Sequence, residues 1–221
     1  MDAIVDQFLN FDILRQSLPL LLTGLWMTAR LCSTVVLLGL VGGLFVALAN
    51  LSTRWWLKIP AIIFIDIFRA LPPLVLLIFI YSGLPFAGIR ITPFAAVALA
   101  FLLNNSSYYA EVYRAGILSV AKGQWEASAS TGLSKPQTLA YVILPQAVRN
   151  VLPELLSNTI EVVKLTSLAS VVSLAELLYN ANMARSITYN ASPLVAAALI
   201  YLVLLWPLVR LVSRFQRRLA A

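Results

Sequence analysis

The sequence is poor in the residues that carry most enzyme chemistry: it has no histidine, one cysteine and few charges. Without histidine it lacks the usual nitrogen ligand of transition metals, and Cys32 alone can build neither an intrachain disulfide nor a cysteine-based metal cluster. Charged residues form only 11% of the 221 residues, whereas soluble domains average about 25%. No G-x-x-x-x-G-K-S/T motif is present, so the chain has no P-loop of its own for ATP. We therefore expect neither a metal site nor a cofactor in this chain.

Apolar residues make up 61% of the chain, more than one domain of this length can bury against itself. The bilayer supplies a second apolar solvent, and a helix that crosses it needs roughly 20 apolar residues. The first residues are acidic and lack the basic region of a signal peptide, so we expect the first helix to direct insertion. We predict a single all-α membrane domain, residues 1–221, of about five transmembrane helices, at about 18–51, 60–84, 91–112, 151–178 and 187–210.

The basic residues are distributed unevenly between the two sides that these spans define. One side carries only Arg15, Arg90 and Arg185. The positive-inside rule then places the N-terminus outside and the C-terminus in the cytoplasm. This orientation accounts for most of the net charge of +7, so no nucleic-acid partner is expected. The ten basic residues of the other side are Arg54, Lys58, Arg114, Lys122, Lys135, Arg149, Arg210, Arg214, Arg217 and Arg218.

The longest segment between spans, about 113–150, is predicted to hold two short helices. The proline-free stretch from Ala110 to Thr131 is rich in helix formers, and Gly132 is a suitable C-terminal stop. Ser134 and Gln137 have capping-box spacing, with Pro136 in the first turn, and Pro145 is expected to end or kink the second helix. The segment is either a connector or, as its small residues at 127–130 favour, a surface that docks on a partner.

Several polar residues lie inside the predicted spans, where charge is costly and usually faces a bundle interior or a water-filled path. Asn158, Glu161 and Lys164 share a helix face; Glu161 and Lys164 either neutralise each other or line a path together with Arg69. Asn104 and the polar residues after it favour interhelical hydrogen bonds over substrate contact. Three further features are noted: a kink with freed carbonyls at Pro72 and Pro73, nearby hydroxyls at Thr166 and Ser167, and close helix packing at Gly39 and Gly43.

Local motifs resemble one known family over nearly the whole chain, from about Leu18 to the end. The stretch Gly123–Ser134, followed by Ile143–Ala147, resembles the EAA motif of ABC importer permeases. Further stretches are similar to the branch of that family that takes up polar amino acids: Thr23-Gly24 with Thr28, Arg69–Pro72 with Tyr81, Tyr109–Ile117, and Lys164–Leu168.

The resemblance implies a multi-pass permease of the bacterial inner membrane, a subunit of an ATP-driven amino acid importer and not itself an enzyme. It implies a P-loop ATPase that holds ATP-Mg, a second permease, identical or paralogous, and an external substrate-binding protein. In such a permease Glu126 would hold the loop or meet a basic residue of the ATPase, and Gly132 would permit the corner. The implied coupling residues are Gly123, Glu126, Ala127, Ser128, Gly132, Leu133 and Pro145; the candidate path residues are Arg69, Asn104, Asn158, Glu161, Lys164, Thr166 and Ser167.

Two other classes of function remain as alternatives. A stand-alone ion-coupled carrier could use Glu161 and Lys164 for proton coupling, but carriers usually show internal repeats and these five spans are unequal. A membrane enzyme would need a cluster of acid, base or nucleophile, for which the sequence offers few candidates.

Overall fold

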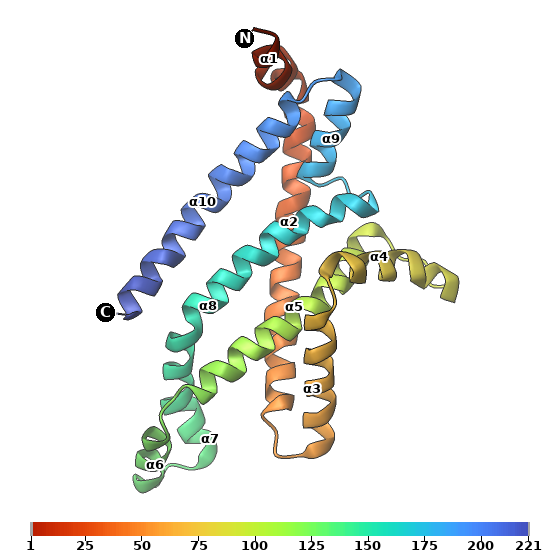
Figure 1. Ribbon diagram of the computed structural model, residues 1–221. Helices are drawn as coiled ribbons and strands as arrows, with labels where there is room; N and C mark the ends of the chain where they lie inside the picture. The colour runs from red at the N-terminus through yellow and green to blue at the C-terminus, as the bar shows by residue number, and fades with distance from the viewer. Residues whose placement is uncertain (1, 221) are drawn as a thin grey trace. The chain divides into compact units, whose positions relative to one another are not determined.

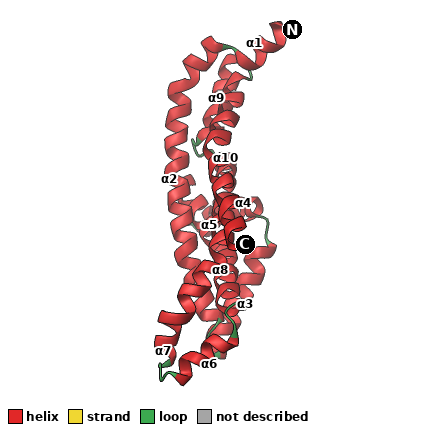
Figure 2. Ribbon diagram, turned by 90° about the vertical axis from the view of Figure 1, so that its left-hand side faces the viewer, coloured by secondary structure: helices red, strands yellow, loops and turns green. Residues whose placement is uncertain are grey.

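The computed structural model describes residues 2–220, and this part of the chain consists of helices joined by short loops, with no β-strand (Figure 1, Figure 2). The elements in chain order are α1 (Asp2–Leu9), α2 (Phe11–Asn50), α3 (Trp55–Ala70), α4 (Pro73–Gly83), the 3-10 turn η1 (Leu84–Ala87), α5 (Pro93–Leu118), α6 (Lys122–Ser130), α7 (Lys135–Thr138), the π turn η2 (Leu139–Ile143), α8 (Leu144–Leu165), the 3-10 turn η3 (Thr166–Val172), α9 (Leu177–Thr188) and α10 (Ser192–Ala220).

Within residues 2–220, three segments are long and apolar enough to cross a membrane: Asp6–Asn50, Lys135–Val172 and Ser192–Arg214. The pair Trp55–Ala70 and Pro73–Ala87 makes a fourth if it counts as one broken span. Helix α5 has 26 residues, but its apolar first half is followed by two asparagines and two serines. The all-α membrane fold is therefore confirmed, whereas the number of five spans and their orientation stay predictions.

The predicted continuous helix over 151–178 is wrong. Helix α8 ends at Leu165, η3 follows, and Ser173 takes a left-handed conformation with φ of 59°. The run from Thr166 to Ser173 is rich in serine, threonine and valine, which are weaker helix formers than leucine or alanine. A separate helix, α9, then starts at Leu177 and runs to Thr188. The last helix, α10, therefore begins at Ser192 and not at 187.

The segment 113–150 also differs from the prediction. The helix expected from Ala110 to Thr131 is divided between two helices. Helix α5 continues to Leu118, and a break separates it from α6. The Ser119 hydroxyl donates to the Gly116 carbonyl at 2.8 Å and so competes with the helix backbone. Pro145 does not end the second helix, which runs from Lys135 through η2 into α8. In η2 the Leu144 N–H bonds the Leu139 carbonyl, and this wider turn directly precedes the residue that lacks an N–H.

The chain divides into two compact units. The first comprises the described residues up to 36 together with 73–101 and 160–210. Its core joins α2, α9 and α10 through the buried residues Leu21, Leu177, Ala181 and Ala197. The backbones of α2 and α9 approach closely at Gly24, where an added Cβ would lie 2.9 Å from the Leu177 Cα.

The second unit comprises 37–72, 102–159 and the described residues from 211 onward. Ala47, Ile65 and Ala110 bring α2, α3 and α5 together. At Gly43 an added Cβ would lie 2.5 Å from the Tyr109 Cβ, and at Gly39 one would lie 3.0 Å from the Asn105 Cβ. The predicted close packing at this glycine pair is therefore confirmed, and α5 is the partner helix.

Candidate coupling hairpin and charged cavity

Helices α6 and α7 form a hairpin, Lys122–Thr138, whose corner is closed by backbone hydrogen bonds (Figure 1). The Leu133 N–H donates to the Ser128 carbonyl at 3.3 Å, and the Gly132 N–H donates to the Ala129 carbonyl at 3.1 Å. This is a Schellman motif, in which the residue after the C-cap is left-handed. Gly132 occupies that position with φ of 80°, and the expected corner lies where the sequence placed it.

The start of α7 is fixed by the predicted capping box of Ser134 and Gln137. The Gln137 Oε1 atom accepts from the Ser134 N–H at 2.9 Å and from the Ser134 hydroxyl at 2.8 Å. Pro136 lies in the first turn, where a missing N–H costs little. Two local motifs therefore hold the hairpin from both sides of its corner.

The hairpin is anchored on α8 by an apolar cluster and one polar contact. Val120, Ile143 and Ala147 are buried together, with Trp125 and Leu139 packed against them. The Gln146 side-chain amide donates to Gln124 Oε1 at 3.1 Å. The hairpin is thus a fixed projection of the second unit.

The outward face of the hairpin carries most of the predicted coupling residues. Gly123, Glu126, Ala127 and Gly132 are exposed and Leu133 is half-buried, while Pro145 is exposed in α8. Ser128 was expected on the small-residue surface, but it is buried, and its hydroxyl donates to the Gln124 carbonyl at 2.6 Å. The Glu126 carboxylate forms no ion pair with any side chain that the structure describes.

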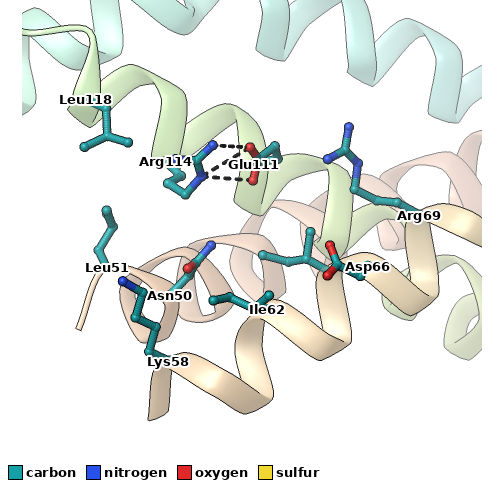
Figure 3. Close-up of a pocket in the computed structure, with 10 residues that line it drawn as sticks. Asn50, Leu51, Lys58, Ile62, Asp66, Arg69, Glu111, Arg114 and Leu118 are labelled. Carbon is teal, nitrogen blue, oxygen red and sulfur yellow. Dashed lines mark hydrogen bonds and ion pairs between the residues drawn. The ribbon is translucent and has the colours of Figure 1, made fainter. Parts of the chain in front are cut away.

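A cavity of about 460 Å³ opens between α3 and α5, within the second unit (Figure 3). Five charged side chains of both signs line it: Lys58, Asp66 and Arg69 from α3, and Glu111 and Arg114 from α5. Its remaining walls are Asn50, Leu51, Ile62, Ile65 and Leu118. Of the charged group, only Arg69 was predicted as a site residue. The spacing of Glu111 and Arg114, three residues apart on a helix, was a signal that could have indicated their pairing.

Arg69 is held by α5 near the end of α3, just before Pro72 and the first residue of α4, Pro73. Its guanidinium lies over the Tyr108 ring, 5.4 Å from the ring centroid, and the Tyr108 hydroxyl donates to the Arg69 carbonyl at 3.4 Å. In an α-helix that carbonyl would accept from residue 73, which is proline and has no N–H. Tyr108 therefore fixes both the backbone and the charge of Arg69.

Asn104, the predicted path residue in α5, is buried and takes part in the same arrangement. Its amide nitrogen donates to the Phe68 carbonyl at 2.8 Å, as the preference for interhelical hydrogen bonds predicted. The side chains of Asn105 and Ser106 that follow are buried too, and the Asn105 amide nitrogen and the Ser106 hydroxyl have no hydrogen-bond partner among the described residues. Asn104 thus supports the helix backbone and does not line the cavity.

The other path residues lie along α8 and at the start of η3. Glu161 and Lys164 form an ion pair with both side chains exposed, which is the structural pairing that the sequence left open. Thr166 is fully buried, and its hydroxyl lies 3.3 Å from the Cys32 Sγ. Ser167 donates to the Lys164 carbonyl at 2.8 Å, and the Asn158 amide nitrogen has no partner within the described residues. Thr166 has no exposed surface in this structure, and the place of these residues along a path stays a prediction.

The described residues combine helices that are long and apolar enough to cross a membrane with an exposed hairpin and a charged cavity. Residues 39–221 match the family described as binding-protein-dependent transport system inner membrane component, and the chain belongs to this family. The resemblance of its motifs to ABC importer permeases is therefore confirmed. Membership in a family of transport subunits decides against both the lone carrier and the membrane enzyme.

Several named proteins are similar over most of the chain. The probable amino-acid ABC transporter permease protein YckA of Bacillus subtilis (strain 168) is 35% identical, over 94% of this chain and 90% of its own. The glutamine transport system permease protein GlnP of Escherichia coli (strain K12) is also 35% identical, over 92% of this chain and 94% of its own. A solved amino acid ABC transporter with histidines matches with a TM-score of 0.88 and 37% identity, over 95% of this chain and 99% of that one.

A more distant solved structure, the MetNI methionine ABC transporter in inward-facing conformations, shares the fold. Its TM-score is 0.73 at 22% identity, over 90% of this chain and 95% of that chain.

Proposed function

We propose that this chain is the permease subunit of an ATP-driven importer of amino acids in a bacterial inner membrane. Its family and the names of its relatives support this, since those relatives are permeases for amino acids. A second permease, identical or paralogous, completes the translocation path, and an external binding protein delivers the amino acid. A separate P-loop ATPase binds and hydrolyses ATP-Mg, because this chain has no P-loop.

The observation that carries the proposal is the fixed α6–α7 hairpin with its exposed small-residue face. The Schellman corner and the capping box hold the hairpin shape, and the apolar cluster at Val120, Ile143 and Ala147 fixes it on α8. A connector needs only a few residues and no such rigidity. Docked in a groove of the ATPase, a rigid hairpin transmits closure of the ATPases to α8 without bending.

The proposal is tested by purifying the tagged chain in mild detergent and measuring how much ATPase comes with it. Glu126→Lys reverses an exposed charge on the hairpin, and Glu154→Lys makes the same change at an exposed position of α8 outside it. We expect the first variant to insert normally but to lose the ATPase and amino acid uptake, and the second to keep both. Gly132→Pro is tested as a second single variant. If Glu126→Lys and Gly132→Pro each retained the ATPase and amino acid uptake, the coupling role would be contradicted.

A further inference from the structure

The cavity between α3 and α5 holds more charge than its ion pair explains. Its volume of about 460 Å³ lies in the usual range of small-molecule sites. Glu111 and Arg114 account for one charge of each sign, since Arg114 Nε donates to the two Glu111 carboxylate oxygens at 3.2 and 3.0 Å. Lys58, Asp66 and Arg69 remain, and Asp66 forms no ion pair with any side chain in the described part of the chain.

Arg69 is presented to the cavity in a fixed position. The Tyr108 ring covers one face of the guanidinium, and the Tyr108 hydroxyl bonds the Arg69 carbonyl. Stacking leaves the N–H edges of an arginine free, and these edges match a planar carboxylate or a phosphate in two parallel hydrogen bonds. The cavity therefore offers the N–H donors of the oriented Arg69 guanidinium. It also offers the unpaired carboxylate of Asp66, three residues earlier on the same helix.

The apolar part of the lining places these charges against a low-dielectric wall. Leu51, Ile62 and Leu118 contribute aliphatic surface, and Asn50 adds one amide. A simple anion would meet Asp66 and Glu111, and a simple cation would meet three basic residues. A ligand that carries one charge of each sign satisfies Asp66 and Arg69 together.

We propose that this cavity binds a zwitterion, with its ammonium group at Asp66 and its acidic group at Arg69. Both a free α-amino acid and the headgroup of phosphatidylethanolamine have this chemistry. By the predicted orientation, Lys58 and Arg114 lie toward the cytoplasmic side, so an amino acid that reaches the cavity is the imported product. That the ligand is an imported product rests on the proposed function, whereas the zwitterion site itself does not.

The test measures binding of tritiated L-glutamine to the permease in nanodiscs, with its co-purified ATPase and without any external binding protein. The lipid is phosphatidylglycerol alone, so that no zwitterionic headgroup is present. Asp66→Asn keeps the side-chain shape and removes the charge, and we expect it to weaken binding by about ten- to hundredfold. Glutaramic acid, which is glutamine without the ammonium group, should compete poorly with the wild-type site and as well as glutamine with Asp66→Asn.

Two control variants separate this cavity from other sites on the chain. Glu154→Gln removes an exposed carboxylate that does not line the cavity, and it should leave the affinity unchanged. The double change of Glu161→Gln and Lys164→Met removes the exposed ion pair of α8. Binding that survives Asp66→Asn but is lost in this double variant would place the glutamine elsewhere and overturn the inference.

A second arm distinguishes the two sources of the zwitterion. Native mass spectrometry from membranes rich in phosphatidylethanolamine counts the lipids that stay bound to wild type and to Asp66→Asn. Lipid retention that depends on Asp66, without glutamine binding, identifies the headgroup as the occupant. If neither ligand depends on Asp66, the cavity has no zwitterion site. ATPase co-purification is measured in the same samples. Absence of the ATPase would contradict the proposed function, and this outcome is distinct from loss of ligand binding.

Discussion

The side-chain amide of Asn104 donates to the backbone carbonyl of Phe68 at 2.8 Å, and Pro72 is the reason that this carbonyl is free. In a continuous helix the Phe68 carbonyl would accept from residue 72, but proline has no N–H. Tyr108, one turn further along α5, meets the carbonyl freed by Pro73 in the same way. A broken helix in a membrane needs such partners, because no water replaces them in the hydrocarbon.

We expect Asn104→Leu to destabilise the protein, because it leaves a half-buried carbonyl without a donor. The loss should be about 1–3 kcal/mol in thermal or denaturant unfolding of the detergent-solubilised protein. Ser106→Ala is the matched control two residues away, since it removes a buried hydroxyl that has no partner. It should be neutral or slightly stabilising. Equal losses in the two variants would show that the Asn104–Phe68 bond contributes little.

The hairpin corner shows which features a sequence can predict. Gly132, Ser134 and Gln137 act on neighbours within a few residues, so their motifs were readable in the chain order and the structure confirms them. The kink at Pro72 and Pro73 was readable for the same reason. The side chains that bond the freed carbonyls, Asn104 and Tyr108, belong to α5. Their role depends on the packing of α5 against α3, which local sequence does not reveal.

The break between α8 and α9 was not predictable from local signals. Glu176 follows an apolar stretch and carries no sign of a helix start, yet it is the N-cap of α9 and fully buried. Glutamate is not among the preferred N-cap residues, so the pattern gave no helix start. The charged cavity was missed for a different reason, because its residues come from α3 and α5, and each looks like a solvated or paired charge alone.

The conformation of Gly132 leads to a prediction with an internal control. An added Cβ meets no other atom within 4 Å at either Gly132 or Gly123, so space does not distinguish the two positions. Only Gly132 has a positive φ, of 80°, which costs a residue with a Cβ about 1–2 kcal/mol. Gly132→Ala should speed amide hydrogen exchange over 122–138 and weaken ATPase association, whereas Gly123→Ala should leave the exchange unchanged. Similar exchange in both variants would contradict the role of the corner conformation.

The close approach of α2 and α5 leads to a test by compensation. An added Cβ at Gly42 would overlap the Ser106 hydroxyl, so Gly42→Ala should reduce stability by about 1–3 kcal/mol through overpacking. Ser106→Ala removes the overlapping atom and should recover most of the loss in the double variant. Gly83→Ala is the control, since no atom lies within 4 Å of a Cβ there. The double-variant cycle is measured by unfolding, and purely additive losses would show that the two residues do not meet.

Glu176 joins α9 to α10 through one carboxylate, and each of its bonds can be tested separately. Its Oε1 accepts from the Tyr179 N–H at 2.7 Å, and its Oε2 accepts from the Leu178 N–H at 2.9 Å and from the Tyr201 hydroxyl at 3.1 Å. Tyr201→Phe removes one donor and leaves both N–H bonds in place. Glu176→Gln replaces one accepting oxygen with an NH₂ group, so a backbone N–H at the start of α9 loses its partner.

We therefore expect Glu176→Gln to destabilise the first unit more than Tyr201→Phe does. The losses should be about 2–3 kcal/mol and about 1 kcal/mol, in line with the penalty for a buried unpaired donor and the loss of one hydrogen bond. Hydrogen exchange of the α9 amides distinguishes a capping role from general packing, because loss of the cap should speed exchange in the first turn of α9 before it affects α10. If Tyr201→Phe has the larger effect on those amides, the carboxylate serves mainly to hold Tyr201, and the cap contributes little to α9.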